Sequence, residues 1–225
     1  MVNLNLKDKN LSVSGLEWNL KENLNNNLNE IREIKNLPEV LKTILYKRNL
    51  FEMNIEDYLS PSLKKLFPNP FSLHDMDKAV DIFIKAIFEK EKIGILGDYD
   101  VDGTSSSALI FNYFRELKLN NVEVYIPDRE NDGYGFSQNA LNYFIKKKVK
   151  TLLCLDCATN DMKNIKEAQG MGLKVVIIDH HEQNIANNSE ALINPKKNID
   201  KSGLNYLATV GLSFLFVVAL NRVLK

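Results

Sequence analysis

The sequence has little of three things that would narrow its function at once: cysteine, net charge and long apolar runs. Its 225 residues include two cysteines, and 29 lysines and arginines balance 29 aspartates and glutamates. A protein whose main role is to coat nucleic acid is usually basic overall, so this balance argues against that class. It leaves open a nucleic-acid enzyme with an acidic metal site and local basic patches.

The two cysteines, Cys154 and Cys157, form a single C-x-x-C with no second pair, which argues against a zinc ribbon. They lie in the apolar run LLCLDC, a setting typical of buried thiols. Free thiols fit a reducing compartment, so we expect a cytoplasmic protein. The first residues, MVNLNLKDKN, lack the apolar core of a signal peptide.

One uncharged stretch, LNYLATVGLSFLFVVAL at 204–220, is a candidate membrane segment. It is shorter than the roughly 20 apolar residues that a membrane span needs, and polar or small residues dilute it. We therefore expect a buried helix and no membrane association. Because the stretch is apolar on nearly all sides, we also expect the helix to contact partners on more than one side.

Sequence pattern divides the chain near residue 90. Residues 1–90 predict a helical N-terminal segment that packs on the part that follows. Apolar residues recur at helical spacing in 37–50 and 76–91, whereas 22–30 is polar and 60–76 is broken by three prolines.

From 91 to 225, apolar runs of strand length alternate with helical segments. We expect strands at 92–97, 122–127, 151–156, 174–179 and 191–195, and helices at 103–119, 137–148 and 160–172. Near-continuous apolar strands that alternate with helices predict an α/β fold, a parallel sheet flanked by helices. In such sheets the ligand site lies outside the carboxyl ends of the strands.

Acidic residues and histidines follow four of these predicted strands. They are Asp98, Asp100 and Asp102 after the first, Asp128 and Arg129 after the second, Asp156 after the third, and Asp179, His180 and His181 after the fourth. Each has an ordinary structural explanation by itself; Asp102, for example, stands where it can cap the next helix. Their convergence on one edge of one sheet favours a common site.

Clustered carboxylates raise one another's pKa values unless a cation neutralises them. Mixed carboxylate and imidazole ligands suit Mn²⁺ or Mg²⁺. Two such ions, about 3.5–4 Å apart, hold both the attacking and the leaving oxygen of a phosphoryl centre. The pattern therefore predicts a site for two divalent ions and phosphoryl chemistry.

Two families share the letters of GDYDVDGTSS at 97–106. Haloacid-dehalogenase-like phosphatases have a strand running into D-x-D-G-T, which would make Asp100 the nucleophile and Asp102 the general acid. That motif needs apolar residues directly before its first aspartate, whereas Asp98 and Tyr99 intervene here. It also leaves the two adjacent histidines unexplained.

The sequence resembles the DHH phosphodiesterases more closely. IIDHHEQ at 177–183 holds the Asp-His-His motif that names the family, and GDYDVDGTSS, IPDRENDGYGFS at 126–137 and LCLDCATND at 153–161 resemble its other motifs in order. The resemblance runs from about residue 37 to the end. It is strongest to the branch of single-strand-specific 5′-to-3′ DNA exonucleases that act in DNA repair and recombination.

This resemblance implies roles for the matching residues. Asp98, Asp100, Asp102, Asp156 and His180 would bind two divalent ions, Mn²⁺ or Mg²⁺, with Asp156 shared between them, and Asp100, Asp156, His180 and His181 would be the catalytic residues. His181 would lie near the scissile phosphate, and Asp179 would orient its neighbours. Arg129 is a candidate phosphate contact; its alternative is an ion pair with Asp128, Glu130 or Asp132.

The same resemblance implies single-stranded DNA as the substrate and partner, with a single-strand-binding protein or a helicase as candidate protein partners. The sequence departs from the family in two ways. Ala158 replaces the usual glycine of the Asp-Cys-Gly motif. The chain also ends before the family's fourth motif, its DHH-associated domain and its OB-fold, so we expect part of a longer enzyme or a shortened relative.

Two other functions stay open at this point. One is a DHH phosphodiesterase that acts on short oligonucleotides or cyclic dinucleotides, against which the long N-terminal segment argues. The other is a non-catalytic DHH-fold domain that binds partners or nucleic acid.

Overall fold

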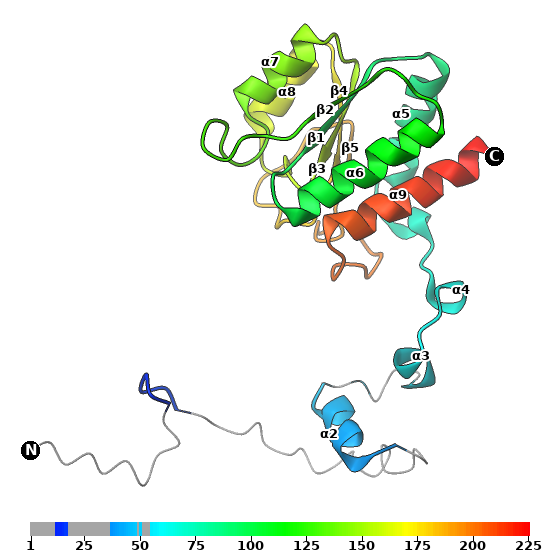
Figure 1. The fold of residues 1–225 in the computed structure, drawn as a ribbon, viewed down its shortest axis with the longest axis vertical. Coiled ribbons are helices and arrows are strands. Elements are labelled where there is room, and N and C mark those ends of the chain that lie inside the picture. The colour runs from blue at the N-terminus through cyan, green and yellow to red at the C-terminus, as the bar shows by residue number, and fades with distance from the viewer. Residues whose placement is uncertain (1–11, 18–36, 49, 51–54) are drawn as a thin grey trace, which may run out of the picture. The chain divides into compact units, whose positions relative to one another are not determined.

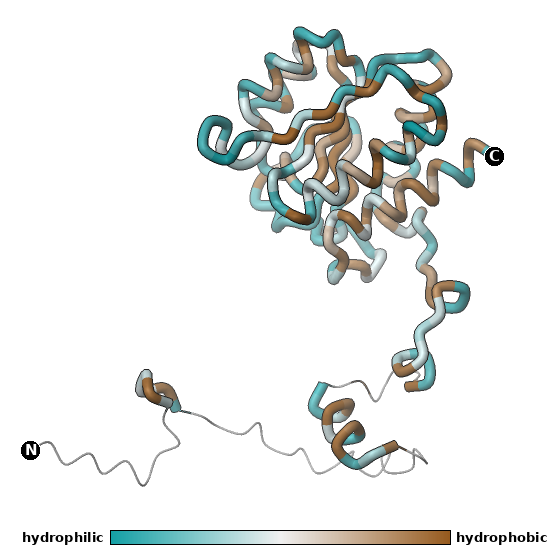
Figure 2. Tube along the Cα trace, viewed as in Figure 1, coloured by the Kyte–Doolittle hydropathy of each residue, from teal (hydrophilic) through white to brown (hydrophobic). Residues whose placement is uncertain are grey.

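Five parallel strands form a single sheet at the centre of the computed structural model (Figure 1). They are β1 (Ile93–Gly97), β2 (Val122–Tyr125), β3 (Thr151–Leu155), β4 (Lys174–Ile178) and β5 (Ala191–Ile193), in the spatial order β2-β1-β3-β4-β5. β1, β3 and β5 are buried along their whole length, and Figure 2 shows the apolar strands enclosed by more polar segments. The predicted parallel sheet is confirmed, because strands covered on both faces need side chains that tolerate burial on both sides.

The structure describes residues 12–17, 37–48, 50 and 55–225, and the chain separates into two units at 67/68. The first unit contains the short helices α2 (Glu39–Lys47), α3 (Ile55–Leu59) and α4 (Leu63–Leu66). The predicted polar stretch at 22–30 lies outside the described residues. The second unit contains the sheet and every predicted site residue.

Helices cover both faces of the sheet (Figure 1). α5 (Met76–Phe88), α6 (Val101–Glu116) and α9 (Thr209–Leu224) lie on one face, and α7 (Gln138–Lys146) and α8 (Met162–Gly170) lie on the other. On the first face three buried rings meet: Phe83 lies 5.9 Å from Phe114 and 5.3 Å from Phe216 between centroids. These rings join α5, α6 and α9 to one another, so the three helices form one apolar layer.

Helix α5 belongs to the second unit, although sequence pattern placed it with the N-terminal segment. It contacts β5, α9 and the 3₁₀ turn η1 (Pro70–Ser72), and Phe83 on α5 is fully buried. The second unit, Pro68–Lys225, therefore includes α5. An amphipathic pattern predicts that a helix packs by one face but not on which neighbour, which explains the difference.

Helix α9 covers most of the uncharged stretch at 204–220. It begins at Thr209 and contacts α6 and α5, and its buried residues include Leu212, Phe216 and Leu220. Among the described residues, no helix combines the length and the apolarity that crossing a membrane requires. The prediction of a buried helix is confirmed.

A buried ion pair ties the residues before α5 to the chain after β5. The Lys197 ammonium lies 2.9 Å from Asp75 Oδ2 and 2.8 Å from His74 Nδ1, and it also donates to the Leu192 carbonyl oxygen. Burial lowers the pKa of Lys197, and only 6% of the residue is exposed. Removing one partner of such a pair leaves a buried charge uncompensated.

We expect Lys197→Met to lower the free energy of unfolding by about 2–4 kcal/mol, because Asp75 would lose its buried cation and keep the exposed Lys78 and the contact with His74. Urea denaturation followed by circular dichroism measures the loss. Lys201→Met is the matched control, since this lysine is exposed, and it should change stability by less than about 0.5 kcal/mol. Equal stability of the two variants would contradict the prediction.

Candidate metal centre

Three aspartates follow directly after three adjacent strands. The backbone N–H of Asp98 donates to Leu155 O, that of Asp156 to Ile178 O, and that of Asp179 to Ile193 O, at 3.0–3.1 Å. Each N–H thus extends the sheet hydrogen bonding by one residue past the strand end. Because the strands are parallel and adjacent, the three side chains emerge along one edge, as the sequence pattern predicts.

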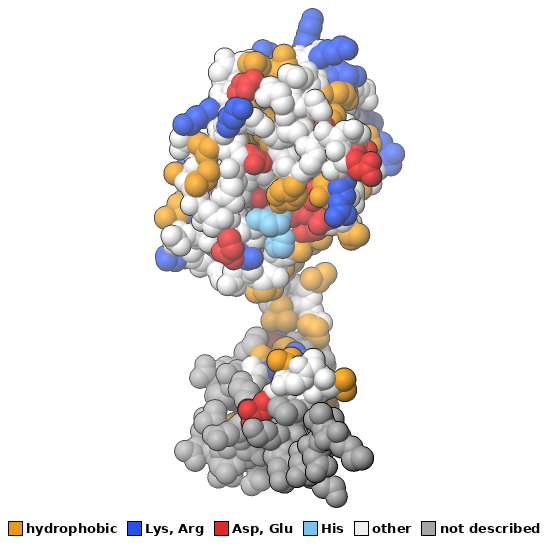
Figure 3. Space-filling model, turned by 90° about the vertical axis from the view of Figure 1, so that its left-hand side faces the viewer, with side chains coloured by type: hydrophobic (Ala, Val, Ile, Leu, Met, Phe, Trp, Pro, Cys, Tyr) orange, Lys and Arg blue, Asp and Glu red, His pale blue; other side chains and the backbone are white. Residues whose placement is uncertain are grey.

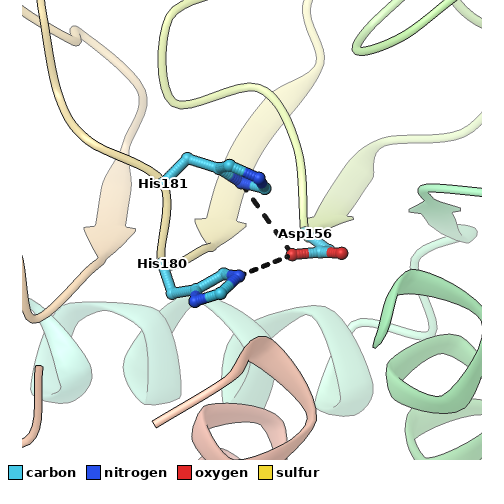
Figure 4. Close-up of side chains that lie close together, drawn as sticks. All are labelled: Asp156, His180 and His181. Atoms are coloured by element: carbon cyan, nitrogen blue, oxygen red, sulfur yellow. Dashed lines mark ion pairs between the residues drawn. The ribbon is translucent and has the colours of Figure 1, made fainter. Parts of the chain in front are cut away.

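The side chains on this edge form two groups with potential metal ligands within 4.8 Å of one another, Asp98–Asp100–Asp156 and Asp156–His180–His181. Asp156 belongs to both. Its Oδ1 lies 3.5 Å from His180 Nε2 and 3.9 Å from His181 Nδ1, and Figure 4 shows both rings directed at this carboxylate. Figure 3 shows histidine side chains near acidic ones on the face in view. The arrangement provides two adjacent sites that share one ligand.

The electrostatics of the cluster fit a cation. Asp98 Oδ1 is buried without a hydrogen-bond partner in the part of the chain that the structure describes. Burial raises the pKa of Asp98, and burial together with the charges of Asp102, Asp100 and Asp179 raises the pKa of Asp156 to about 7. A divalent ion would supply the missing partner and remove this repulsion. The mixed oxygen and imidazole donors suit Mn²⁺ or Mg²⁺.

Asp179 contacts both histidines of the DHH motif. Its Oδ1 accepts hydrogen bonds from the backbone N–H of His180 at 2.7 Å and of His181 at 3.2 Å, and it lies 2.7 Å from His181 Nδ1. Burial raises the pKa of Asp179, but the bonds from His181 and Thr159 outweigh this and lower it overall. The bond to Asp179 raises the pKa of His181. Asp179 therefore fixes the orientation of the His181 ring.

Asp102 lies outside both donor groups, although the sequence placed it among the metal ligands. Its two carboxylate oxygens accept hydrogen bonds from the backbone N–H groups of Thr209 and Val210, each at 2.8 Å. It thus caps α9, while Asp100 caps α6 by accepting from the N–H of Asp102. Asp102 therefore caps a helix from the other end of the domain while its Oδ2 lies 3.6 Å from His180 Nε2, beside the two donor groups.

Sequence reasoning missed Thr209, which touches the centre directly. Its hydroxyl donates to Asp156 Oδ1 at 2.8 Å, and the residue is fully buried at the start of α9. The positive end of the helix dipole thereby faces the acidic cluster. A threonine at the start of an apolar stretch indicates the N-terminus of a helix. It does not indicate which residue the threonine hydroxyl will contact.

Arg129 is exposed beside this edge of the sheet. Its guanidinium carbon lies 5.7 Å from the centre of the Tyr99 ring, and it forms no ion pair with any other residue that the structure describes. The neighbouring acids are engaged in the loop itself: Asp128 accepts from the N–H of Glu130 and Asn131, and Asp132 from Tyr125 and Asn139. The guanidinium is therefore available to an anion.

Ala158 occupies a backbone conformation that favours glycine, with φ 75° and 3% exposure. Asp156 has φ 63°, so two left-handed residues flank the buried Cys157. Both cysteines are buried free thiols, as predicted. Left-handed alanine costs about 1–2 kcal/mol relative to its usual conformation. Ala158 is therefore strained.

We expect Ala158→Gly to raise the free energy of unfolding by about 0.5–1 kcal/mol, because relief of strain exceeds the added freedom of the unfolded chain. Ala140→Gly, within helix α7, should lower it by about 1 kcal/mol and is the matched control. Thermal unfolding of both variants beside the parent measures the two changes. A less stable Ala158→Gly variant would show that the strain argument fails.

Comparison with known proteins bears on this geometry. The model of the DHH family, N-terminal domain, matches residues 92–223. The chain belongs to the DHH family. The residues matched begin just before β1 and end within α9, so they include the whole sheet and both donor groups of the candidate metal centre.

Individual relatives are RecJ proteins. The chain is 27% identical over 209 residues to the single-stranded-DNA-specific exonuclease RecJ of Bacillus subtilis, covering 92% of this chain and 26% of that protein. It is 28% identical over 210 residues to RecJ of Escherichia coli, covering 92% and 36%. The crystal structure of exonuclease RecJ bound to manganese superposes with a TM-score of 0.62 at 24% identity, covering 68% of this chain and 39% of that one. The chain thus spans about a quarter to a third of the curated relatives' length.

Proposed function

We propose that this DHH domain is a divalent-metal-dependent phosphodiesterase that hydrolyses single-stranded DNA from its 5′ end, in the manner of the RecJ exonucleases that it resembles. One observation carries the proposal: Asp156 belongs to two donor groups at the carboxyl edge of a parallel sheet. A shared carboxylate between two ligand sets is what a two-ion phosphoryl-transfer site requires. RecJ relatives that match 92% of the chain support the substrate class.

Asp98, Asp100, Asp156 and His180 would hold two Mn²⁺ or Mg²⁺ ions, with Asp102 as a further candidate. Bound there, the ions neutralise the carboxylates, activate water and stabilise charge on the phosphate oxygens. Thr209 keeps the Asp156 carboxylate in one orientation through its hydrogen bond. The orientation of the shared ligand is therefore fixed by a residue that is not itself a proposed metal ligand.

The remaining residues would act on the substrate. Arg129 would bind a phosphate group of the DNA, because its guanidinium is exposed and forms no ion pair with another described residue. His181 would hold a proton at Nε2 and donate it to a phosphate oxygen, since Asp179 occupies Nδ1 and raises the pKa of the ring. Asp179 orients this ring and the backbone of both histidines.

The test uses the purified chain with Mn²⁺ and single-stranded DNA labelled at either the 5′ or the 3′ end. We expect mononucleotides to be released from the 5′ end, with no release after chelation or in Asp156→Asn. Asp81→Asn, an exposed change on α5, is the control and should retain activity. Absence of hydrolysis by a folded, metal-binding chain would contradict the proposal, and cleavage of dinucleotides alone would favour the other phosphodiesterase class.

A further inference from the structure

The loop between β2 and α7 is tied to the start of α8 by a single carboxylate. Asp161 stands at the N-cap position of α8, yet its side chain makes no capping bond to its own helix. Its Oδ2 instead accepts a hydrogen bond from the backbone N–H of Phe136 at 2.6 Å. An N-cap aspartate normally satisfies the first turn of its helix, so this one serves the neighbouring loop instead.

The close approach of the two segments depends on Gly135. A Cβ at this position would lie 2.5 Å from Asp161 Oδ2, and the residue has φ 90°. The Asn164 side chain makes a second connection by donating to the Phe136 carbonyl oxygen. Both polar groups of the Phe136 backbone are thus held by α8 and its cap, which determines where the preceding residue lies.

That preceding loop carries Tyr134, whose hydroxyl reaches the metal centre. It lies 3.2 Å from Nδ1 and 3.3 Å from Nε2 of His181, and it donates to the Asp156 carbonyl oxygen at 3.3 Å. The two rings meet edge to face with centroids 5.7 Å apart. Burial and the charges of Asp179 and Asp156 raise the pKa of Tyr134, so the phenol stays protonated. Tyr134 thus supplies a second contact to the imidazole beside that of Asp179.

Asp161 and Tyr134 also line one cavity together with Asp179 and His181. Its volume is about 330 Å³, and Thr159 and Asn160 are among its other lining residues. Release of the loop from Asp161 would change both this wall and the contact to His181.

We infer that Asp161 is a positioning residue that acts through the 133–136 loop: it places the Tyr134 hydroxyl against His181 and so holds the imidazole in the orientation used at the scissile phosphate. Its catalytic consequence rests on the proposed function, but the geometric coupling does not. The alternative is that Asp161 only stabilises the loop, with no effect on the histidine.

Nuclear magnetic resonance of the histidine rings separates these cases without any activity. The chain has three histidines, so the ring nitrogens can be assigned with single substitutions at His74, His180 and His181. We would compare the metal-free parent, Asp161→Ala, Asp161→Asn and Tyr134→Phe at one pH, with thermal unfolding to confirm that each variant folds. Asp81→Ala is the matched control, an acid on the exposed face of α5.

We expect Asp161→Ala and Tyr134→Phe to shift the His181 nitrogen resonances in the same direction and to leave His74 unchanged. Asp161→Asn should restore the parent spectrum, because its amide oxygen still accepts from Phe136. An unshifted His181 in folded Asp161→Ala, or in Tyr134→Phe, would overturn the inference. Equal shifts of all three histidines would overturn it as well, since they would indicate a general loosening.

Activity gives a second measurement on the same variants. With Mn²⁺ and single-stranded DNA, Asp161→Ala should lower kcat by about 10- to 100-fold, with a smaller change in KM and recovery in Asp161→Asn. An unchanged kcat in Asp161→Ala beside an active parent would overturn the catalytic part of the inference. A parent chain without activity would instead count against the proposed function, and the ring resonances would still decide the coupling.

Discussion

Replacing Asp156 with asparagine is expected to make the metal-free domain more stable and to abolish metal-dependent hydrolysis. Burial and the charges of Asp102, Asp100 and Asp179 raise the pKa of Asp156 from 3.8 to about 7. A carboxyl group with a raised pKa in the folded state binds protons more tightly there than in the unfolded chain. Its favourable contribution is therefore complete below about pH 4 and is lost as pH rises toward 7.

The substitution removes this pH-dependent loss with little other change. Asparagine keeps an oxygen that accepts from Thr209, and it tolerates the left-handed backbone at this position, where φ is 63°. We expect the free energy of unfolding of metal-free Asp156→Asn to exceed that of the parent by about 2–4 kcal/mol at pH 8, and by much less at pH 4. Denaturation with a chelator present, at several pH values, measures the difference.

Metal should reverse the order of stability. The donor groups come together only in the folded chain, so Mn²⁺ should raise the Tm of the parent strongly and that of Asp156→Asn weakly. Hydrolysis should fall at least about 100-fold, because Asp156 belongs to both donor groups. A variant that is less stable than the metal-free parent at pH 8, or that responds equally to Mn²⁺, would contradict this account of the site.

Replacing Gly103 with alanine is expected to destabilise the domain at its metal centre. A Cβ on Gly103 would lie 2.5 Å from both the backbone nitrogen and the carbonyl oxygen of Asp98. Neither atom can yield without moving the end of β1, from which Asp98 enters the centre. We expect a loss of about 2–3 kcal/mol in the free energy of unfolding and a smaller Mn²⁺-induced rise in Tm.

A second helical glycine provides the control for this prediction. Gly170 ends α8, and a Cβ there would meet nothing within 4 Å. Gly170→Ala should therefore stabilise the domain by about 0.5–1 kcal/mol, as the helix propensities of the two residues imply. If Gly103→Ala proved as stable as Gly170→Ala, close packing of α6 against Asp98 would not be what requires glycine there.

The order of strands and helices was predictable because burial on both faces leaves a strong sequence signal. β3 and β4 are almost continuous runs of apolar residues, as is typical of parallel strands that are buried on both faces. The carboxyl edge followed from that arrangement, and with it the convergence of Asp98, Asp156 and Asp179. The DHH resemblance then attached a chemistry to these positions.

The contacts between distant segments were not predictable in the same way. Asp102 and Thr209 lie 107 positions apart and meet only because α9 packs along α6. Asp161 lies within the helix predicted at 160–172, and only the structure shows that its carboxylate binds the loop beside it. Neither pairing produces a periodic pattern in the sequence. Each depends on where the end of a helix lies, whereas periodicity reports which face of a helix is buried.

Taken by itself, the sequence determined the α/β class, the edge on which the acids and histidines gather, and the DHH family. The tertiary structure decided which contacts each of these side chains makes. It assigned Asp156 to both donor groups, Asp102 to the N-terminus of α9, and a left-handed conformation to Ala158. The physical reason is that hydrophobic periodicity is a local property of the chain, whereas hydrogen-bond partners and backbone strain are set by the packing of elements far apart in sequence.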